Sequence, residues 1–177
     1  MSDPSHQRDV HPAALSVEQL LQDCEVKRTR GSGPGGQHRN KVETAIVIKH
    51  LPTEVIGQAS ERRRQEDNRK EAINRLRVNL AISCRCPIDN IQSYQPSDLW
   101  KARVKGKQIS ISESHADFPA ILAEAMDVLV ACSLDSGKSA EVLGCSSSQL
   151  IKLLKKDRAA MDWVNRQRTA NDLSVYR

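Results

Sequence analysis

The first half of the chain alternates apolar and polar positions and is rich in β-branched residues, a pattern typical of half-buried strands. Residues 42–50, VETAIVIKH, show this pattern most strongly. Residues 24–30 and 54–59 are predicted as two further strands, and a turn at residues 51–53 precedes the second of them. The first half of the chain is therefore predicted to contain three strands.

Helical patterns lie on both sides of these strands. Ser16 is expected to cap a short helix at residues 17–22, and Ser60 to cap a long helix that runs to about residue 81. Residues 61–71 are all polar or charged, so the front half of the long helix must project into solvent or lie on another surface. The apolar stripe of this helix is formed by Ala72, Ile73, Leu76 and Leu80.

The polar front half of the long helix has two interpretations, and both stay open. Its five basic and four acidic residues include opposite charges four positions apart, which stabilise a solvated helix. The same stretch could instead dock on RNA through Arg62, Arg63 and Arg64.

The signal weakens over residues 82–114. Residues 99–104 and 108–112 are predicted as two short strands around a turn candidate, Lys-Gly-Lys, at residues 105–107. This stretch either completes the first domain or connects it to the next region.

From residue 117 onward the apolar residues recur every three and four positions, which predicts an all-helical region. Ala140, Gly144, Leu150 and Leu153 have the spacing of a helix-turn-helix, with Ser146 or Ser147 as the cap of its second helix. A last helix is expected from residue 158 to about 169. Side chains of the second helix that could face a nucleic acid are Gln149, Lys152, Lys155 and Lys156. A helical bundle with a solvated lysine face explains the pattern equally well.

Charge and composition favour an acidic partner. The chain has 177 residues, a formal net charge of +5 and a pI near 9.1, which points to nucleic acid. Aromatic residues make up 3% of the chain, so contacts to phosphate and RNA shape are expected rather than base stacking. No apolar run approaches the ~20 residues of a membrane span, so no membrane partner is expected.

Five cysteines, an odd number, and a polar amino-terminal stretch indicate reduced thiols in a cytoplasmic protein. Neither these cysteines nor the five histidines have the spacing of metal ligands. We therefore expect neither a metal nor a cofactor.

A glycine-rich loop interrupts the predicted sheet. Residues 31–37, GSGPGGQ, contain four glycines and a proline, so neither a helix nor a strand can run through them. Residues 27–41 contain no acid. The basic residues that flank the loop are Lys27, Arg28, Arg30, Arg39 and Lys41. A cationic loop of this kind suits a polyanion. The simpler interpretation is a glycine linker, or a nest of backbone amides that binds one phosphate. The glycine patterns of nucleotide-binding loops do not match.

The string SGPGGQ at residues 32–37, followed by NKV at 40–42, resembles the catalytic loop of class I peptide chain release factors. It is even more similar to the loop of their codon-independent relatives, which rescue stalled ribosomes. IKHLPT at residues 48–53 is similar to the family's turn after its central strand, and residues 75–77 to the end of its helix. The resemblance covers about residues 15–81 and implies a small α+β domain.

This resemblance implies hydrolysis of the ester bond between a nascent peptide and the P-site tRNA, in the peptidyl transferase centre of the large ribosomal subunit. Gly35, Gly36 and Gln37 match the family's catalytic residues. In the family the backbone amide at the Gln37 position stabilises the transition state, and the side chain favours water as the nucleophile. Gln37 is also the implied site of amide methylation by a glutamine methyltransferase. Because the loop holds no nucleophile–base pair, it must work by positioning.

The resemblance and the patterns together give a complete expectation for the fold. It is α+β: a small, mainly antiparallel sheet with one long helix and an exposed Gly-Gly-Gln loop, followed by an all-α, helix-turn-helix-like carboxyl-terminal region. The expected segments are a disordered tail at 1–14, a Gly-Gly-Gln catalytic domain at 15–82, a connector with a β-hairpin at 83–114 and a helical region at 115–177.

The leading hypothesis is a peptidyl-tRNA hydrolase that frees nascent chains from stalled ribosomes or split large subunits. Its partners are the large subunit, ribosomal RNA and the P-site peptidyl-tRNA. Only about thirty residues precede the loop, so codon-independent release is expected. The RNA-binding residues are predicted to be Arg28, Arg30, Arg39, Lys41, Arg62, Arg63, Arg64, Lys152 and Lys155.

Two features bear on the subfamily. His38 and Arg39 stand where rescue factors commonly have small or apolar residues. Residues 148–177 have regular apolar spacing, unlike the disordered basic tail of the well-known rescue factors, which favours a subfamily that acts on separated large subunits. The alternative is a non-catalytic RNA- or DNA-binding protein that uses the helix-turn-helix-like region. A genuine termination factor is a third option, which would require a decoding element.

Overall fold

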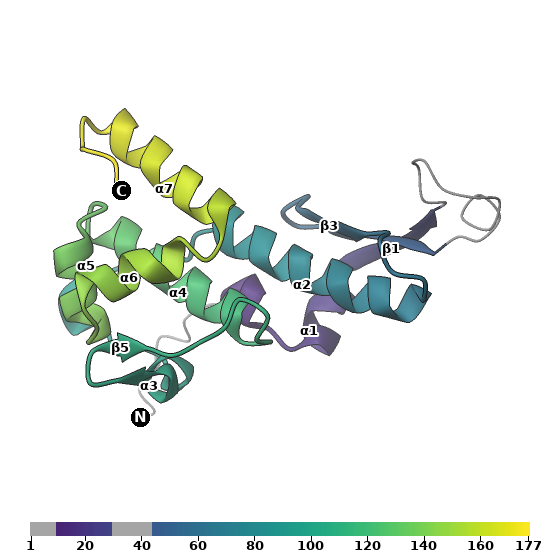
Figure 1. Cartoon of the computed structure of the whole chain (residues 1–177), viewed down its shortest axis with the longest axis horizontal. Helices are drawn as coiled ribbons and strands as arrows, with labels where there is room; N and C mark the ends of the chain where they lie inside the picture. Colours follow the sequence, from purple (N-terminus) through teal and green to yellow (C-terminus); the bar gives the residue numbers. More distant parts are fainter. Residues whose placement is uncertain (1–9, 30–43) are drawn as a thin grey trace, which may run out of the picture.

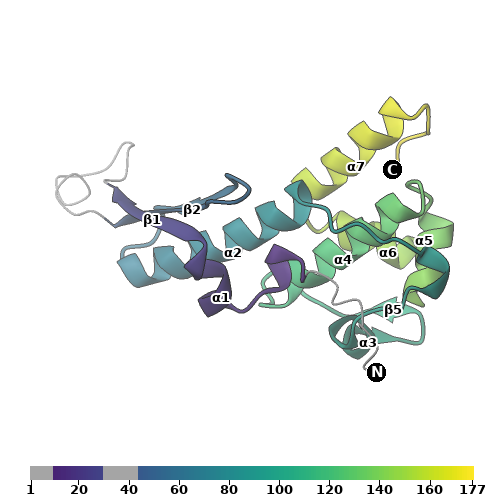
Figure 2. The same cartoon turned by 180° about the vertical axis from the view of Figure 1, so that it is seen from behind.

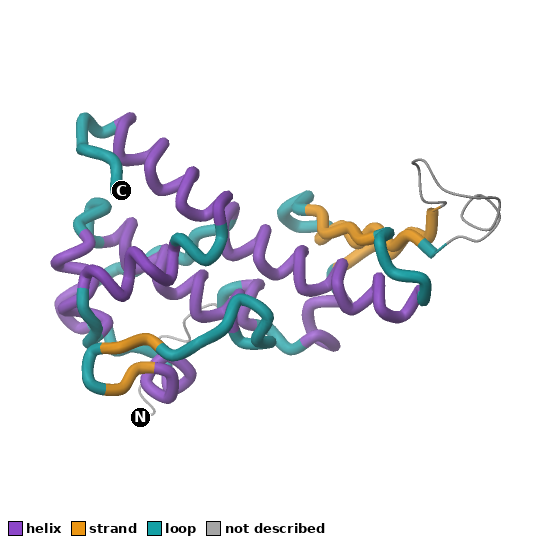
Figure 3. The backbone as a smooth tube through the Cα atoms, in the orientation of Figure 1, coloured by secondary structure: helices purple, strands orange, loops and turns teal. Residues whose placement is uncertain are grey.

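The structure, a computed structural model, describes residues 10–29 and 44–177. A three-stranded sheet lies at one end of the molecule and a group of helices at the other, and the long helix α2 runs between them (Figure 1). Figure 3, coloured by secondary structure, shows this separation of sheet and helices. In the described residues, the other β-structure is a two-stranded hairpin. The predicted α+β class is confirmed.

The sheet is antiparallel throughout, with the strand order β1-β2-β3. Its strands are β1 (Cys24–Thr29), β2 (Ala45–His50) and β3 (Ile56–Ala59). The central strand β2 is the most buried of the three, because its Ile46 and Ile48 point toward α2 and are at most 2% exposed. The strong β-branched pattern of residues 42–50 therefore marks the centre of the sheet.

Helix α2 (Gln65–Ser83) supports the sheet with the stripe that the sequence predicts: Ala72, Leu76 and Leu80 are fully buried. Its predicted start is wrong. The helix begins at Gln65 rather than at 61, and Ser60 is not its cap. The reason is a side chain from the next turn: the Asn68 amide bonds both the N–H and the carbonyl of Arg62, which holds residues 61–64 outside the helix.

The amino-terminal part of the described chain is ordered. Ser16 caps helix α1 (Val17–Gln22), as expected, and the side chain of Gln19 completes a capping box that was not predicted. Within the segment expected to be a loose tail, the 3-10 helix η1 (Pro12–Ala14) buries Ala13 completely. Seen from behind, η1 lies against both α2 and α4 (Figure 2). Ordered structure therefore starts earlier than the predicted boundary at residue 15.

Residues between α2 and the carboxyl-terminal helices contain η2 (Ile91–Ser93), α3 (Asp98–Arg103), β4 (Val104–Lys105) and β5 (Gln108–Ile109). The strands β4 and β5 form a hairpin around Gly106 and Lys107, both with positive φ. The strand predicted for residues 99–103 is wrong, because these residues form α3. Ser97 caps α3, and Trp100 is fully buried with its indole N–H donated to the carbonyl of Leu143.

The carboxyl-terminal region is helical, as predicted. Its helices are α4 (Phe118–Ala131), α5 (Ser136–Leu143), α6 (Ser147–Leu154) and α7 (Arg158–Ala170). Gly144 ends α5 with a φ of 65°, and Ser146 caps α6. Buried apolar residues of the sheet, α2 and α4–α7 belong to one continuous core. Among the described residues, no helix is both long and apolar enough to cross a membrane.

Candidate functional site

The Gly-Gly-Gln loop is attached to a defined part of the fold. Gly35, Gly36 and Gln37 lie outside the described residues, as do Arg30, Arg39 and Lys41. The described chain stops at Thr29, at the end of β1, and resumes at Thr44, just before β2. Thr29 pairs with Ala45 across the sheet, so the two chain ends that carry residues 30–43 lie side by side.

A buried amide fixes one of these ends. Asn68, in the first turn of α2, is 0% exposed. Its Nδ2 donates to the carbonyl of Thr44 (2.7 Å) and to that of Arg62 (2.9 Å), while its Oδ1 accepts from the N–H of Arg62 (2.8 Å). Asn68 therefore joins the returning end of the loop to the arginine-containing segment.

Asn68 was not among the predicted site residues, although the sequence contains a signal for it. Asn68, Ala72, Leu76 and Leu80 follow one another at intervals of four, so all four lie on one side of α2. A polar residue in line with an apolar stripe needs hydrogen-bond partners when it is buried. The partners here come from the backbone of two loops.

The arginines predicted to bind RNA lie beside the attachment of the Gly-Gly-Gln loop. Arg62, Arg63 and Arg64 are exposed and precede α2 at the end of the molecule that carries the sheet (Figure 1). Two basic residues within α2 have acidic partners: Lys70 pairs with Glu66 at 3.0 Å, and Arg75 pairs with Glu61 and Glu71. Ion pairs thus support the solvated-helix interpretation for Glu66 and Lys70, while docking on RNA through Arg62–Arg64 stays a prediction.

Arg28 occupies a second exposed position near the same strand ends. It lies opposite Ile46 in the sheet and lines an open depression of about 370 Å³ between β1 and the start of α2. The other lining residues are Val26, Ile46, Gln65, Glu66 and Arg69. The end of the molecule with the loop thus carries several exposed guanidinium groups.

The two lysines predicted to bind RNA lie elsewhere. Lys152 and Lys155 are exposed on α6, in the group of helices at the other end of α2. Gln149, which was expected to face a nucleic acid with them, instead accepts the N–H of Ile109 at 3.4 Å. The N–H of Ser146 donates to the carbonyl of Lys107. The hairpin β4–β5 therefore covers the start of α6, the part of a recognition helix that would contact base edges.

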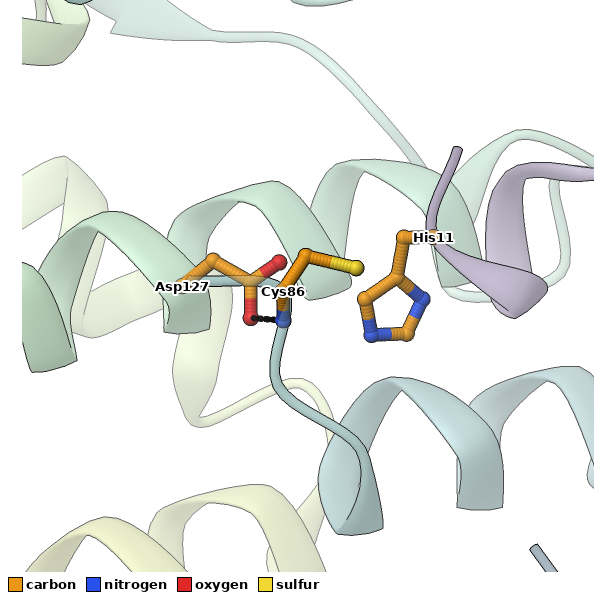
Figure 4. Close-up of side chains that lie close together, drawn as sticks. All are labelled: His11, Cys86 and Asp127. Carbon is orange, nitrogen blue, oxygen red and sulfur yellow. Dashed lines mark hydrogen bonds between the residues drawn. The ribbon is translucent and has the colours of Figure 1, made fainter. Parts of the chain in front are cut away.

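Three potential metal ligands, His11, Cys86 and Asp127, meet between η1, the segment after α2 and α4 (Figure 4). Their ligand atoms lie within 4.8 Å of one another. Each of the two buried groups already has partners: His11 Nδ1 accepts from the N–H of Ala13, and Asp127 Oδ1 accepts from the N–H of Cys86 and from Arg85 Nη1 (3.0 Å). The positive charge of Arg85 at the Asp127 carboxylate repels a metal cation from this position.

Burial dominates the ionisation of this cluster. It lowers the pKa of His11 to about 4, so the ring is neutral near pH 7. It also raises the pKa of Asp127 to about 6, against the opposite effect of Arg85. We interpret the cluster as a hydrogen-bonded junction between three segments rather than a metal centre. No spacing in the sequence indicated it, because its members are far apart along the chain.

Comparison with known proteins identifies the family. The sequence model of the RF-1 domain matches residues 14–116, more than half of the chain and well beyond residue 81. The chain is 26% identical over 136 residues to "Peptide chain release factor 2" of Buchnera aphidicola, an alignment that covers 70% of this chain and 37% of that protein.

Two shorter alignments have higher sequence identity. The chain is 41% identical over 69 residues to the chloroplast "Peptide chain release factor PrfB1" of Arabidopsis thaliana, covering 39% of this chain and 15% of that protein. It is 46% identical over 61 residues to "Peptide chain release factor 1" of Xylella fastidiosa, covering 34% and 17%.

All three relatives are much longer than the part that this chain matches, which is between about a sixth and somewhat more than a third of their length. No solved structure matches the chain significantly. The RF-1 domain nevertheless spans the sheet, α2 and the hairpin. By this domain, the chain belongs to the class I peptide chain release factor family.

Proposed function

We propose that this protein hydrolyses the ester bond of peptidyl-tRNA in the peptidyl transferase centre of the large ribosomal subunit, and so frees nascent chains from stalled ribosomes. One observation carries the proposal. The string GSGPGGQ at residues 31–37 lies inside the matched RF-1 domain, between two paired strands that bring its ends together.

In this proposal, Gly35, Gly36 and Gln37 carry the chemistry. Ester hydrolysis needs a placed water and stabilisation of the negative charge that develops on the carbonyl oxygen. The backbone N–H at Gln37 supplies that stabilisation, and the side chain of Gln37 selects water. Glycines at 35 and 36 permit backbone shapes that a β-carbon would oppose. Methylation of the Gln37 amide by a glutamine methyltransferase belongs to the same proposal.

Basic residues at the loop end hold ribosomal RNA and the P-site tRNA. They are Arg28, Arg30, Arg39, Lys41, Arg62, Arg63 and Arg64. The exposure of Arg28 and of Arg62–Arg64 beside the strand ends supports this assignment. Lys152 and Lys155, at the other end of α2, supply a second and separate RNA contact.

Codon-independent action in the cytoplasm is the finer part of the proposal. It is supported by the similarity of residues 32–37 and 40–42 to rescue factors. The folded carboxyl-terminal tail favours split large subunits as the substrate, because Tyr176 is bonded through its backbone to Asn165 and through its hydroxyl to Leu134. These bonds hold Tyr176 against the helices.

Peptide release from purified ribosomal complexes tests the function directly. Labelled nascent peptide is followed on ribosomes stalled on a truncated mRNA, on a stop-codon complex and on split large subunits, with wild type and Gln37→Ala in parallel. We expect release by the wild type alone, whatever the codon. Release confined to the stop codon would instead make the protein a termination factor.

A complete lack of release by the wild type on all three substrates would reject the enzyme. If salt-sensitive binding to RNA or DNA persisted, the alternative of a non-catalytic nucleic-acid-binding protein would replace it. Charge reversal at Lys152 and Lys155 would then abolish that binding. In the proposed enzyme the same change weakens ribosome binding and leaves the chemistry of bound complexes intact.

A further inference from the structure

We propose that Asn68 is a positioning residue for peptidyl-tRNA hydrolysis, because its buried amide fixes the point where the chain returns from the Gly-Gly-Gln loop. The inference rests on the proposed function and adds to it a residue of α2 that lies outside the loop. It makes the placement of Thr44 relative to Arg62 a determinant of the reaction rate.

The geometry leaves the Asn68 side chain no freedom. The amide is fully buried and makes three hydrogen bonds of 2.7–2.9 Å, all of them to backbone groups. Two of these bonds reach Arg62 and one reaches Thr44, which lies 24 residues before Asn68 in the sequence. One side chain thus joins Thr44, the segment before α2 and the first turn of α2.

The role requires an amide of this length. Asn68 uses an acceptor toward one N–H and donors toward two carbonyl oxygens. An aspartate in its place would keep the acceptor but set a carboxylate against two carbonyls. Serine offers one short hydroxyl, and alanine leaves all three backbone groups without this partner, which is costly in a buried position.

The bond to Thr44 affects the reaction because it lies next to the loop. Thr44 directly follows residues 30–43 in the sequence, and β2 begins at the next residue, Ala45. Catalysis by positioning is sensitive to small displacements, and a shift of ~1 Å in a reacting group can lower a rate by about a hundredfold. Loss of the Asn68 bonds frees the returning end of the loop while the apolar contacts of Ala72, Leu76 and Leu80 still hold α2 on the sheet.

Asn79 provides a matched control on the same helix. Its Nδ2 also donates to a strand carbonyl, that of Ile56 at 2.7 Å, but Ile56 is the first residue of β3 and pairs with Lys49, near the opposite end of the sheet from Thr29 and Ala45. Asn79→Ala therefore removes a single, exposed hydrogen bond between helix and strand far from the loop. An effect on release that Asn68→Ala shows and Asn79→Ala lacks, at the same fraction of folded protein, is specific to the loop end.

The experiment measures single-turnover peptide release against factor concentration for wild type, Asn68→Ala, Asn68→Ser and Asn79→Ala. For Asn68→Ala we expect the maximal rate to fall by about tenfold or more, while the concentration for half-maximal rate changes by less than about threefold. Asn79→Ala keeps both values. Asn68→Ser, the milder change, serves if the alanine variant does not fold.

Hydrogen exchange supplies a readout that does not depend on activity. The amides of Thr44, Ala45 and Arg62 should exchange faster in the Asn68 variants, and those of β3 should not. Equal release by Asn68→Ala and Asn79→Ala, in the presence of an active wild type, would overturn the positioning role alone. Release by neither wild type nor variants would overturn the proposed function and the positioning role together.

Discussion

Gly57 on β3 and Leu76 on α2 approach so closely that a β-carbon added at Gly57 would lie 2.6 Å from the β-carbon of Leu76. It would also lie 2.3 Å from the carbonyl oxygen of Ala72, which belongs to the helix backbone. Neither neighbour is a flexible chain end. The distance between the helix and the sheet, and with it the position of Asn68 relative to Thr44, therefore depends on a glycine at this position.

Gly57→Ala is expected to lower the free energy of unfolding by about 3 kcal/mol, because α2 must move away from the sheet to admit the methyl group. Urea unfolding of the two proteins measures the difference. Gly137→Ala is the comparison, since a β-carbon there would meet only the Asp135 side chain at 3.1 Å and should change stability by less than about 1 kcal/mol. Similar losses in both variants would contradict the close helix–sheet contact.

Tyr176 holds the carboxyl-terminal tail against the turn between α4 and α5. Its hydroxyl accepts the N–H of Ser136 (2.9 Å) and donates to the carbonyl of Leu134 (2.6 Å), and Arg168 stacks over its ring. Tyr176→Phe should cost about 1 kcal/mol, because it leaves the Ser136 amide without this partner. Tyr176→Ala should cost more.

Thermal unfolding of the Tyr176 variants, with Val175→Ala as control, checks this expectation. Val175 is 50% exposed, so its truncation should be nearly neutral. Identical unfolding temperatures for all variants would show that the tail is not held by Tyr176.

The cluster of His11 and Asp127 predicts opposing effects of pH on stability. The pKa of His11 is lowered from 6.5 to about 4 in the fold, so its contribution is present above pH 6.5 and is lost as the pH falls toward 4. The pKa of Asp127 is raised from 3.8 to about 6, so stability is gained as the pH falls from about 6 toward 3.8. Between pH 6 and 4 the two effects partly cancel.

In Asp127→Asn, the loss of stability that His11 causes at low pH should no longer be offset by Asp127. Relative to wild type, the variant should lose up to about 3 kcal/mol more between pH 6.5 and 4, since one pKa unit corresponds to about 1.4 kcal/mol. Urea unfolding of both proteins across this range gives the two curves. Parallel curves would mean that Asp127 titrates normally despite its burial.

The exposed arginines before α2 should control the salt dependence of ribosome binding. Replacing Arg62, Arg63 and Arg64 by glutamine should reduce the slope of log affinity against log salt by about 2, because each phosphate contact to single-stranded RNA contributes about 0.7. Binding to large subunits over a series of KCl concentrations measures the slope. Arg75→Gln, at a guanidinium already paired with Glu61 and Glu71, should leave it unchanged. An unaltered slope in the triple variant would remove this segment from the RNA interface.

Sequence patterns predicted the elements whose signals are local. The strand at β2, the Ser16 cap of α1, the buried stripe of α2 and the turn at Gly144 each follow from neighbouring residues. The prediction was wrong at both places where a distant contact opposes a local preference. Asn68 draws residues 61–64 out of the helix, and the burial of Trp100 against Leu143 accompanies a helix where alternation suggested a strand.

By itself, then, the sequence determined the α+β class, the placement of the Gly-Gly-Gln string between two strands and the family resemblance, because these depend on periodicity and on a contiguous motif. Only the tertiary structure decided which polar groups meet: Asn68 with Thr44 and Arg62, and His11 with Asp127. These contacts depend on how α2 and α4 pack against each other and against the rest of the chain. Burial then forces each polar group to find a partner, whatever its distance along the chain.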